Sequence, residues 1–335
     1  MHPIKPAPLQ RHGWQPPRGL PVGNMRGHAR VRDDASLADL ALDRADGLLA
    51  TADARQPIVR MATVGDMIWQ AGYVPGTNVL ETTGHDDDGE LRIVDFMPVA
   101  EGRPGQAESV SPARFVRIVT CTEGEVSFRL VCGGSADGRS GTQALTKQGW
   151  YLACSSAMAP GDEATEANVH LRAGESVALV IAQDAVQGGA GLIADALHAL
   201  GDTIHYWTWW SDRCRYKGDD FDGVLRDALN LKLACSAGGG LLVEDAGANG
   251  FAPAPLGECT RAAGTFLSLG YRNECVALLS HVVSQAHADT AGRWSPDACV
   301  SATLADYVTK YGDTGLPDAL RAAWPQTGLP PAKQA

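Results

Sequence analysis

Three consecutive runs decide the fold class of this chain: Thr77-Asn-Val-Leu-Glu-Thr-Thr83, Asp86-Asp-Asp-Gly89 and Leu91-Arg-Ile-Val-Asp-Phe-Met97. Two apolar runs rich in β-branched residues flank a turn that ends in Asp-Gly. These two residue types tolerate the positive φ that tight hairpin turns require. The acidic spacing and the closing Glu of an EF-hand loop are absent, so we expect a hairpin turn here rather than a calcium site.

The same pattern continues to Gln183. The runs 114–121 and 125–132 flank Glu123-Gly124 and predict a second hairpin. Further strands are expected at 149–154, 166–171 and 176–182. Many short strands separated by turn signals every roughly 8–12 residues indicate an antiparallel β-sandwich.

Helical periodicity begins after Ala190. Helices are expected at 192–200, from Phe221 to a stop at Gly238, at 256–269 with Gly270 at the end, at 273–287 and at 297–310. The predicted fold class is therefore mainly β plus α: an antiparallel β-sandwich followed by a short α-helical domain, an incomplete α/α barrel. The expected domains are a Pro/Gly-rich N-terminal arm at 1–57 with a short helix at 37–49, a β-sandwich at 58–190, a helical, Trp-rich linker at 191–220, an α-helical domain at 221–324 and a flexible tail at 325–335.

Composition narrows the class of partner. The chain has 335 residues, with 28 Lys and Arg against 39 Asp and Glu, a formal net charge of −11. An acidic balance of this size disfavours an extended nucleic-acid surface. The sequence has no run of 18 apolar residues and no apolar stretch behind the first residues, so neither a spanning helix nor a secretory signal is expected. We therefore expect a cytoplasmic protein without a nucleic-acid or membrane partner.

The eight cysteines favour thiols over metal or disulfide chemistry. No two of them lie within four residues of one another, and there is no Cys-x-x-Cys pair. Zinc sites use ligands close enough in sequence to share one tetrahedron. We expect buried free thiols, no metal and no cofactor.

Several motifs resemble glycoside hydrolase family 15, the glucoamylase and trehalase-like enzymes of prokaryotes. The matching runs are 77–82, Asp88-Gly89, Val94-Asp-Phe-Met-Pro98, 115–119 with 124–126, 207–218 and 224–232, with a weaker echo at Leu269-Gly-Tyr-Arg-Asn-Glu274. The resemblance implies an N-terminal super-β-sandwich followed by a catalytic (α/α)6 barrel. It covers about 77–232.

The chain departs from this family where the family binds and cleaves sugar. The family's substrate loop falls on 247–253 and 256–259, where its sugar-binding arginine becomes Gly257 and its aspartate becomes Glu258. Inverting hydrolysis needs two carboxylates about 6.5–9.5 Å apart. Neither family carboxylate can be carried over to this chain, which we expect to hold about four barrel helices where a closed barrel has twelve. We therefore do not expect ordinary glucoamylase or trehalase activity.

Candidate site residues gather around the Trp-rich linker and the remnant of the substrate loop. Trp207 and Trp210 are candidates for stacking on a sugar ring, and packing between domains is the alternative. Arg213 and Arg226, with Glu244, are candidates for a clamp on anions or hydroxyls, and self-pairing is the alternative. Glu258, Asp245 and His205 are the candidates for acid–base catalysis, because burial of one carboxylate would raise its pKa.

Three functional hypotheses follow. The first is a family 15-like carbohydrate-active protein that has lost ordinary hydrolysis and has a saccharide-binding or regulatory role, with a saccharide or another small molecule as its ligand. The second is an enzyme of changed reaction type that uses the cleft between sandwich and helices. The third is an assembly subunit in which uncovered helix faces contact a partner. Because exposed apolar faces usually mark interfaces, we expect a homodimer.

Overall fold

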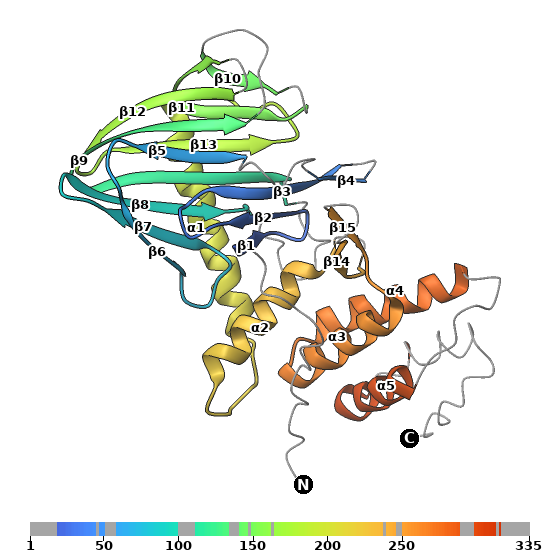
Figure 1. Ribbon diagram of the computed structural model, residues 1–335. Coiled ribbons are helices and arrows are strands. Elements are labelled where there is room, and N and C mark those ends of the chain that lie inside the picture. Colours follow the sequence, from blue (N-terminus) through green and yellow to red (C-terminus); the bar gives the residue numbers. More distant parts are fainter. Residues whose placement is uncertain are drawn as a thin grey trace. The chain divides into compact units, whose positions relative to one another are not determined.

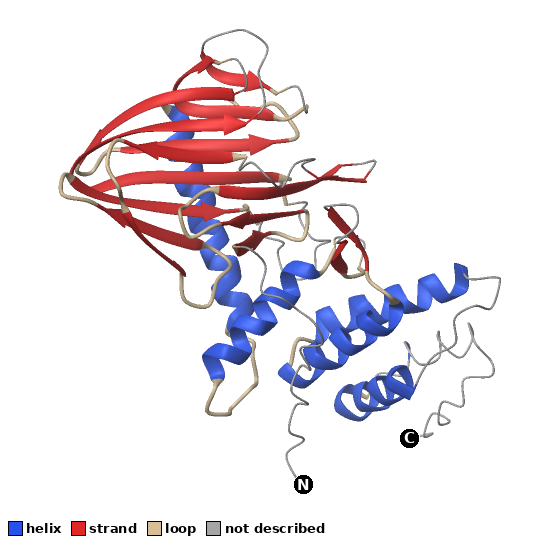
Figure 2. Cartoon of the chain, in the orientation of Figure 1, coloured by secondary structure: helices blue, strands red, loops and turns tan. Residues whose placement is uncertain are grey.

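The computed structural model describes residues 19–44, 47–50, 58–99, 111–133, 141–146, 149–161, 164–236, 239–245, 250–288, 298–312 and 315. The side chains of 43–50, 244–245, 250–251, 286–288 and 298–299 lie outside that description. The chain divides into a sandwich unit (Gln15–Ser211 with Asp245–Phe251) and a helical unit (Met1–Trp14, Asp212–Glu244 and Ala252–Ala335). Strands come first and helices later (Figures 1 and 2), which confirms the predicted β plus α class.

Thirteen strands form one large, entirely antiparallel sheet in the sandwich unit. They are β1 (Leu20–Gly23), β2 (Gly27–Val31), β3 (Leu37–Arg44), β4 (Gly47–Ala50), β5 (Val59–Thr63), β6 (Ile68–Tyr73), β7 (Leu80–His85), β8 (Gly89–Phe96), β9 (Arg114–Gly133), β10 (Gly141–Leu145), β11 (Tyr151–Pro160), β12 (Ala164–Arg172) and β13 (Ser176–Ala182). The sheet folds into two layers, because β9 and β11 each pair with different strands along their two halves. The core lies between the layers, where alternate residues of each strand point inward. Leu40 and Leu42 come from one layer, and Ile93, Phe115 and Leu179 come from the other.

A single strand, β9, replaces the second hairpin that the sequence predicts. Its first half pairs with β8 and β13, and its second half pairs with β5 and β12. The chain bends at Gly124, whose φ of +67° suits glycine, and the register of β8 against β9 shifts between Glu90 and Leu91. The turn signal at Glu123-Gly124 therefore marks a bend that passes from one layer to the other.

The predicted helix at 37–49 is also wrong, because these residues form β3 and β4. Leu37 and Leu40 have the i,i+3 spacing of a helix face, and both are buried in the core cluster. A register shift between Arg30 and Val31 of β2 places Leu37 opposite Val31 and Asp39 opposite Arg30, leaving Ala38 as the extra residue of a bulge. The bulge brings both leucines to the same side of a strand. Residues 20–44 and 47–50 thus belong to the sandwich and not to an N-terminal arm.

The Asp-rich turn between β7 and β8 is a hairpin turn, as predicted. The Asp86 Oδ1 atom accepts hydrogen bonds from the backbone N–H groups of Asp88 and Gly89, at 2.9 and 3.1 Å. This Asx-type turn uses the first aspartate to close the loop. Across the described residues, no group of three or more His, Cys, Asp or Glu side chains is arranged to hold a metal ion.

One long helix, α1 (Gly191–Ser211), packs on the sandwich against β9, β11 and β13. It extends the predicted helix at 192–200 through the Trp-rich run. Two hydrogen bonds fasten it to the strand ends: the Ser211 hydroxyl donates to the Gly76 carbonyl at 2.6 Å, and the Thr203 hydroxyl accepts from the Val99 N–H at 3.3 Å. The C-terminal half of α1 is therefore part of the sandwich unit.

The helical unit contains α2 (Phe221–Ala234), α3 (Leu256–Leu269), α4 (Arg272–Ala288) and α5 (Ala298–Tyr311). A short hairpin of β14 (Leu242–Asp245) and β15 (Gly250–Pro253) lies between α2 and α3 in the chain. Both α4 and α5 pack on α3. The Lys310 ammonium of α5 donates to the Leu267 carbonyl near the end of α3, at 2.5 Å. Cations at helix C-termini stabilise the unpaired carbonyl groups there.

The described cysteines agree with the prediction of buried thiols. Seven of them are free and buried, and the side chain of Cys299 lies outside the described residues. Burial raises the pKa of Cys132 and of Cys275 to about 12, which keeps both groups as thiols. None of the helices in the described parts of the chain has the length and apolar character needed to cross a membrane.

Candidate functional site

The candidate site is built on the first turn of α4. Gly270 ends α3 with a φ of +96°, a left-handed conformation that glycine adopts without strain, and its N–H bonds to the carbonyl of Leu267. The chain then reverses within two residues and α4 begins. The residues Tyr271-Arg272-Asn273-Glu274 are therefore presented on one helical turn, with successive side chains about 100° apart.

Two of these four residues point into the helical unit. Glu274, with 5% of its side chain exposed, lies 3.4 Å from the Arg213 Nη2 atom and 3.4 Å from the Lys232 Nζ atom, through the same oxygen, Oε1. Lys232 belongs to α2 and is 9% exposed, whereas Arg213 is 30% exposed. One buried carboxylate group therefore lies between two basic side chains. We refer to Arg213, Lys232, Tyr271 and Glu274 as the charge centre.

Tyr271 completes the charge centre. It is buried, and the Arg213 guanidinium lies over its ring at 5.9 Å from the centroid, a cation–π contact. Burial, followed by the neighbouring Cys214, raises the pKa of the Tyr271 hydroxyl above its ordinary value. The phenol is therefore neutral at physiological pH and serves as a hydrogen-bonding and packing group.

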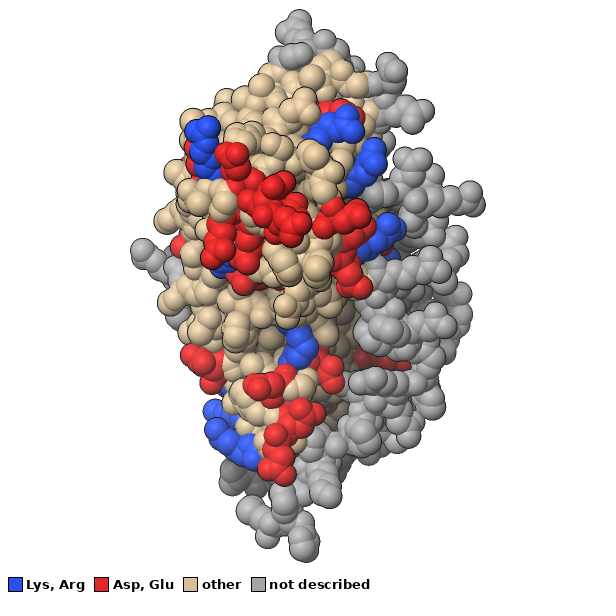
Figure 3. Space-filling model, turned by 60° about the vertical axis from the view of Figure 1, so that its left-hand side comes forward, with Lys and Arg blue, Asp and Glu red and all other residues tan. Residues whose placement is uncertain are grey.

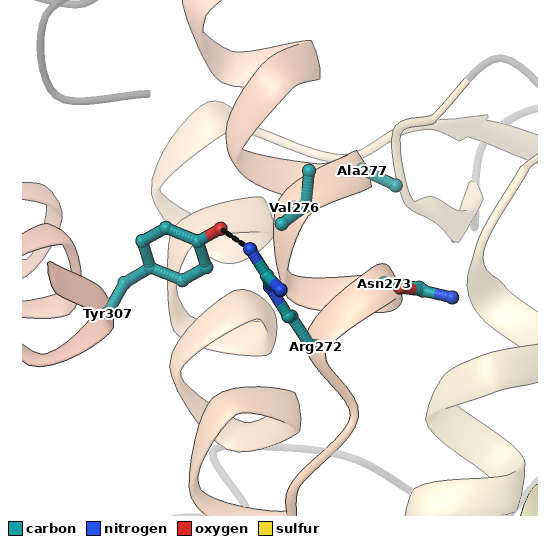
Figure 4. A pocket seen from close by; sticks show the side chains of 5 residues that line it. All are labelled: Arg272, Asn273, Val276, Ala277 and Tyr307. Carbon is teal, nitrogen blue, oxygen red and sulfur yellow. Dashed lines mark hydrogen bonds between the residues drawn. The ribbon is translucent and has the colours of Figure 1, made fainter. Parts of the chain in front are cut away.

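The other two residues, Arg272 and Asn273, are exposed and line a hollow of about 380 Å³ that we call the α4 hollow. It is lined by Arg272, Asn273, Val276, Ala277 and Tyr307. Figure 4 shows Arg272 reaching from α4 to Tyr307 on α5, where its Nη2 atom donates to the Tyr307 hydroxyl at 3.3 Å. Arg272 also lies over the Tyr311 ring, at 5.0 Å from the centroid. These contacts hold the guanidinium at the edge of the hollow.

The chemistry of the α4 hollow is that of a binding site. A guanidinium has five N–H donors, and the Asn273 amide supplies both a donor and an acceptor. Val276 and Ala277 contribute apolar surface one turn further along the helix. None of the five lining residues carries a carboxylate, a thiol or an imidazole. The lining can therefore hold a polar ligand, and its one described hydroxyl group, that of Tyr307, accepts a hydrogen bond from Arg272.

The aromatic candidates of α1 are interior residues. Trp207 and Trp210 are fully buried, and their rings contact each other edge to face, 6.1 Å between centroids. Neither ring presents a face to solvent in the described structure. Both are therefore placed as packing residues rather than as a surface for stacking on a sugar. Trp209 is the tryptophan of this run with an exposed ring, and His205 is exposed on the same helix.

The charged candidates do not form one site. Glu258, in the first turn of α3, is 49% exposed and forms an ion pair with Arg261, one turn along the same helix. Glu244 and Asp245 lie in β14, and their side chains are outside the described residues. Arg226 is half-buried on α2. Of the predicted binding residues, Arg213 is the one that the structure places in the charge centre.

Sequence reasoning missed most of this arrangement. Lys232 and the run 269–274 were recognised only as parts of the family resemblance, without a role. Lys232 and Glu274 are 42 residues apart in the sequence and meet at 3.4 Å through the packing of the helical unit. The available signal was the sequence Tyr271-Arg272-Asn273-Glu274 itself, since four polar or aromatic residues open a helix directly after a glycine.

A strongly acidic surface lies elsewhere, at the turns of the sandwich strands. Asp87, Asp88, Glu123, Glu125 and Glu175 are all exposed there. Figure 3 shows acidic side chains gathered on this face of the sandwich unit. A field of this sign repels anionic groups that approach this face.

Comparison with known proteins gives no match, since neither any family model nor any curated protein sequence matches this chain.

Proposed function

We propose that this chain is a non-hydrolytic, saccharide-binding protein with a family 15-like architecture, and that the α4 hollow is its ligand site. One observation carries the proposal: the hollow joins the hydrogen-bonding groups of Arg272 and Asn273 to apolar surface, and none of its described lining residues carries a carboxylate. A pyranose ring presents hydroxyl groups at its edge and C–H groups on its faces. A volume of about 380 Å³ is at the lower end of the range for small-molecule pockets and is large enough for one or two sugar rings.

The architecture supports the same proposal. A sandwich, a long helix and then paired helices occur in the order that the resemblance implies. Two segments that carry the resemblance, the end of α2 and the run 269–274, meet at the charge centre behind the hollow. A shared function of those segments would explain why they resemble the family while the substrate loop does not.

The carboxylates of the described residues support binding without hydrolysis. A retaining or inverting glycosidase needs two carboxyl groups on either side of the scissile bond, one of them held protonated by its environment. Glu258 is 49% exposed and forms an ion pair with Arg261 on the same helix, so it is not enclosed with a second carboxylate. The buried Glu274 is occupied by two cations. A cytoplasmic location belongs to the same proposal and is supported by the seven free thiols of the described residues.

The test is a panel of glucose, maltose, isomaltose and trehalose, read by ligand-induced melting shifts and by calorimetric titration of the full chain. We expect at least one sugar to bind without being cleaved. Asn273→Ala should weaken binding by about 2- to 10-fold and Arg272→Ala by about 10- to 100-fold, because neutral and charged hydrogen bonds differ in strength by about that factor.

Glu258→Gln is the matched control, since Glu258 is an exposed polar residue of the same unit that does not line the hollow. Its affinity for the sugar should equal that of the wild type. Affinity that is unchanged in both Arg272→Ala and Asn273→Ala would place the ligand elsewhere. Turnover that Glu258→Gln abolishes would show that the remnant loop is an active site.

A further inference from the structure

The exposed apolar side chains lie on a different part of the molecule from the one expected. In the helical unit, the large apolar residues exposed by more than a third in the described structure are Phe221 and Val243. The two most exposed apolar side chains of the described residues are Val64 and Ile68, at 90% and 67%. Both belong to the sandwich unit, at the entry to β6. Uncovered helix faces therefore give no support to a homodimer, whereas β6 offers another surface.

β6 is an edge strand that has no charged residue, proline or bulge in the described structure. It pairs with β7 and with no other strand of the described structure. Proteins protect sheet edges with lysine, proline, bulges or inward-facing charges. The strand reads Ile68-Trp-Gln-Ala-Gly-Tyr73, which contains no charge and no proline, and its pairing with β7 runs without a register shift. An edge of this kind is a template for another strand.

The side chains on the inward face of β6 contact the core but are only partly buried. Met67, Trp69, Ala71 and Tyr73 all pack against the core cluster, and all four are only partly buried. The Trp69 ring covers Gly84 on β7, where an added Cβ would lie 2.3 Å from the ring. A further strand beside β6 would cover these side chains and give them new cross-strand neighbours.

The strand is complementary to itself. Antiparallel pairing keeps side chains on the correct face only if the numbers of facing residues add up to an even number, because strand side chains alternate. A twofold axis at Ala71 meets this condition. It places Trp69 of each copy opposite Tyr73 of the other, on the core side, and Gln70 opposite Gly72 on the outer side. Aromatic cross-strand pairs are among the stabilising ones.

We infer that β6 pairs antiparallel with β6 of a second copy about an axis at Ala71, so that one sheet layer continues through a homodimer. The occupant is a second copy because this register pairs aromatic with aromatic, small with small and no charge with a like charge. A six-residue strand pair with its flanking side chains is at the small end of specific interfaces. We therefore expect association at about micromolar concentration.

The experiment is light scattering of the full chain after size-exclusion chromatography, from about 1 to about 200 µM, around the expected Kd. The wild type should pass from monomer to dimer. Ile68→Lys/Gln70→Lys adds four lysines to the paired edge and should remain monomeric throughout, which is a loss of at least about 100-fold in affinity. Both residues are exposed, so the fold should tolerate the change.

Leu145→Lys/Leu197→Lys is the matched control, with two exposed leucines of the same unit replaced, one of them on the edge strand β10. It should dimerise like the wild type. A wild type that stays monomeric, or an Ile68→Lys/Gln70→Lys variant that still dimerises, would overturn the inference.

A cysteine pair tests the register. Ala71→Cys should give a disulfide-linked dimer on mild oxidation, because facing Cα atoms lie about 4.5–5.5 Å apart in an antiparallel pair. Gly72→Cys should not, since the two substituted residues are then diagonal neighbours about 7–8 Å apart. A Cβ at Gly72 meets no atom within 4 Å, so this control also leaves the fold unstrained. Cross-linking of Gly72→Cys instead of Ala71→Cys would reject the axis.

Discussion

Each unit of the molecule contains a buried charge group, and the two groups have different geometries. In the sandwich, Arg117 of β9 binds Asp95 of β8 through two bonds of 2.7 Å, and both side chains are almost completely buried beside the apolar core. In the helical unit, Glu274 meets Arg213 and Lys232 at 3.4 Å through a single oxygen, and Arg213 is partly open to solvent.

The two geometries indicate different roles: the Arg117–Asp95 pair is structural, whereas the charge centre lies next to the candidate site. A bidentate pair facing across two strands specifies one register, since Asp95 and Arg117 are directly opposed. The charge centre is looser, and it is held by the same helical turn whose other residues line the α4 hollow. Changes in the hollow and in the charge centre should therefore be coupled, whereas the sandwich pair should respond to folding alone.

The largest effect is expected from Arg117→Met. The substitution leaves a buried carboxylate without its cation, which costs about 3–5 kcal/mol of unfolding free energy. Urea denaturation measures this loss. Asp95→Leu/Arg117→Met removes both charges and should recover most of the stability. A single variant within about 1 kcal/mol of the wild type would show that the pair is not the tight structural element described here.

His28 should make the sandwich unit sensitive to acid. Burial lowers the pKa of this imidazole from 6.5 to about 4. Between those two pH values the unfolded chain binds a proton that the folded chain does not, so stability falls as the pH falls from about 6.5 to about 4, by about 3 kcal/mol. His28→Gln should lack this part of the pH dependence. Parallel pH profiles of unfolding free energy for the two proteins would contradict the assignment.

A smaller effect is expected from Glu274→Gln in the charge centre. The amide keeps a hydrogen-bond acceptor beside Arg213 and Lys232 but removes the charge, and a loss of about 1–3 kcal/mol is expected. Thermal or urea unfolding gives the value. If this loss equals that of Arg117→Met, the contrast between a tight and a loose group disappears.

The smallest effect is expected from Glu258→Gln. An exposed ion pair on one helix contributes about 0.3–0.5 kcal/mol, so unfolding should shift by no more than that. A loss above about 2 kcal/mol would mean that Glu258 has a buried role that its exposure does not show. The same variant serves as the control for sugar binding.

Where local chemistry decides, the fold could be predicted from the sequence. The bounds of α3 were predicted because Gly270 ends it with a left-handed residue, and the β7–β8 hairpin was predicted because Asp86 and Gly89 close the turn. The prediction failed at two places where a strand is irregular. Ala38 makes a bulge that imitates helical spacing, and Gly124 bends β9 between layers where a hairpin turn was expected.

Less of the candidate site could be predicted. Trp207 and Trp210 are of a residue type that often stacks on sugar rings. Both side chains are fully buried, however, and the sequence alone does not show which tryptophans are buried. The charge centre joins α2, α4 and the segment after α1 through contacts between distant residues, which leave no local signal. The hollow depends on how α5 packs beside α4, so Tyr307 could not be assigned to it in advance.

The most direct test of the account is a calorimetric titration of the wild-type chain with maltose and trehalose, followed by analysis of the same solution for released glucose. We expect binding of a sugar with no glucose released, and weaker binding after Arg272→Ala. Release of glucose, or wild-type affinity in Arg272→Ala, would contradict it.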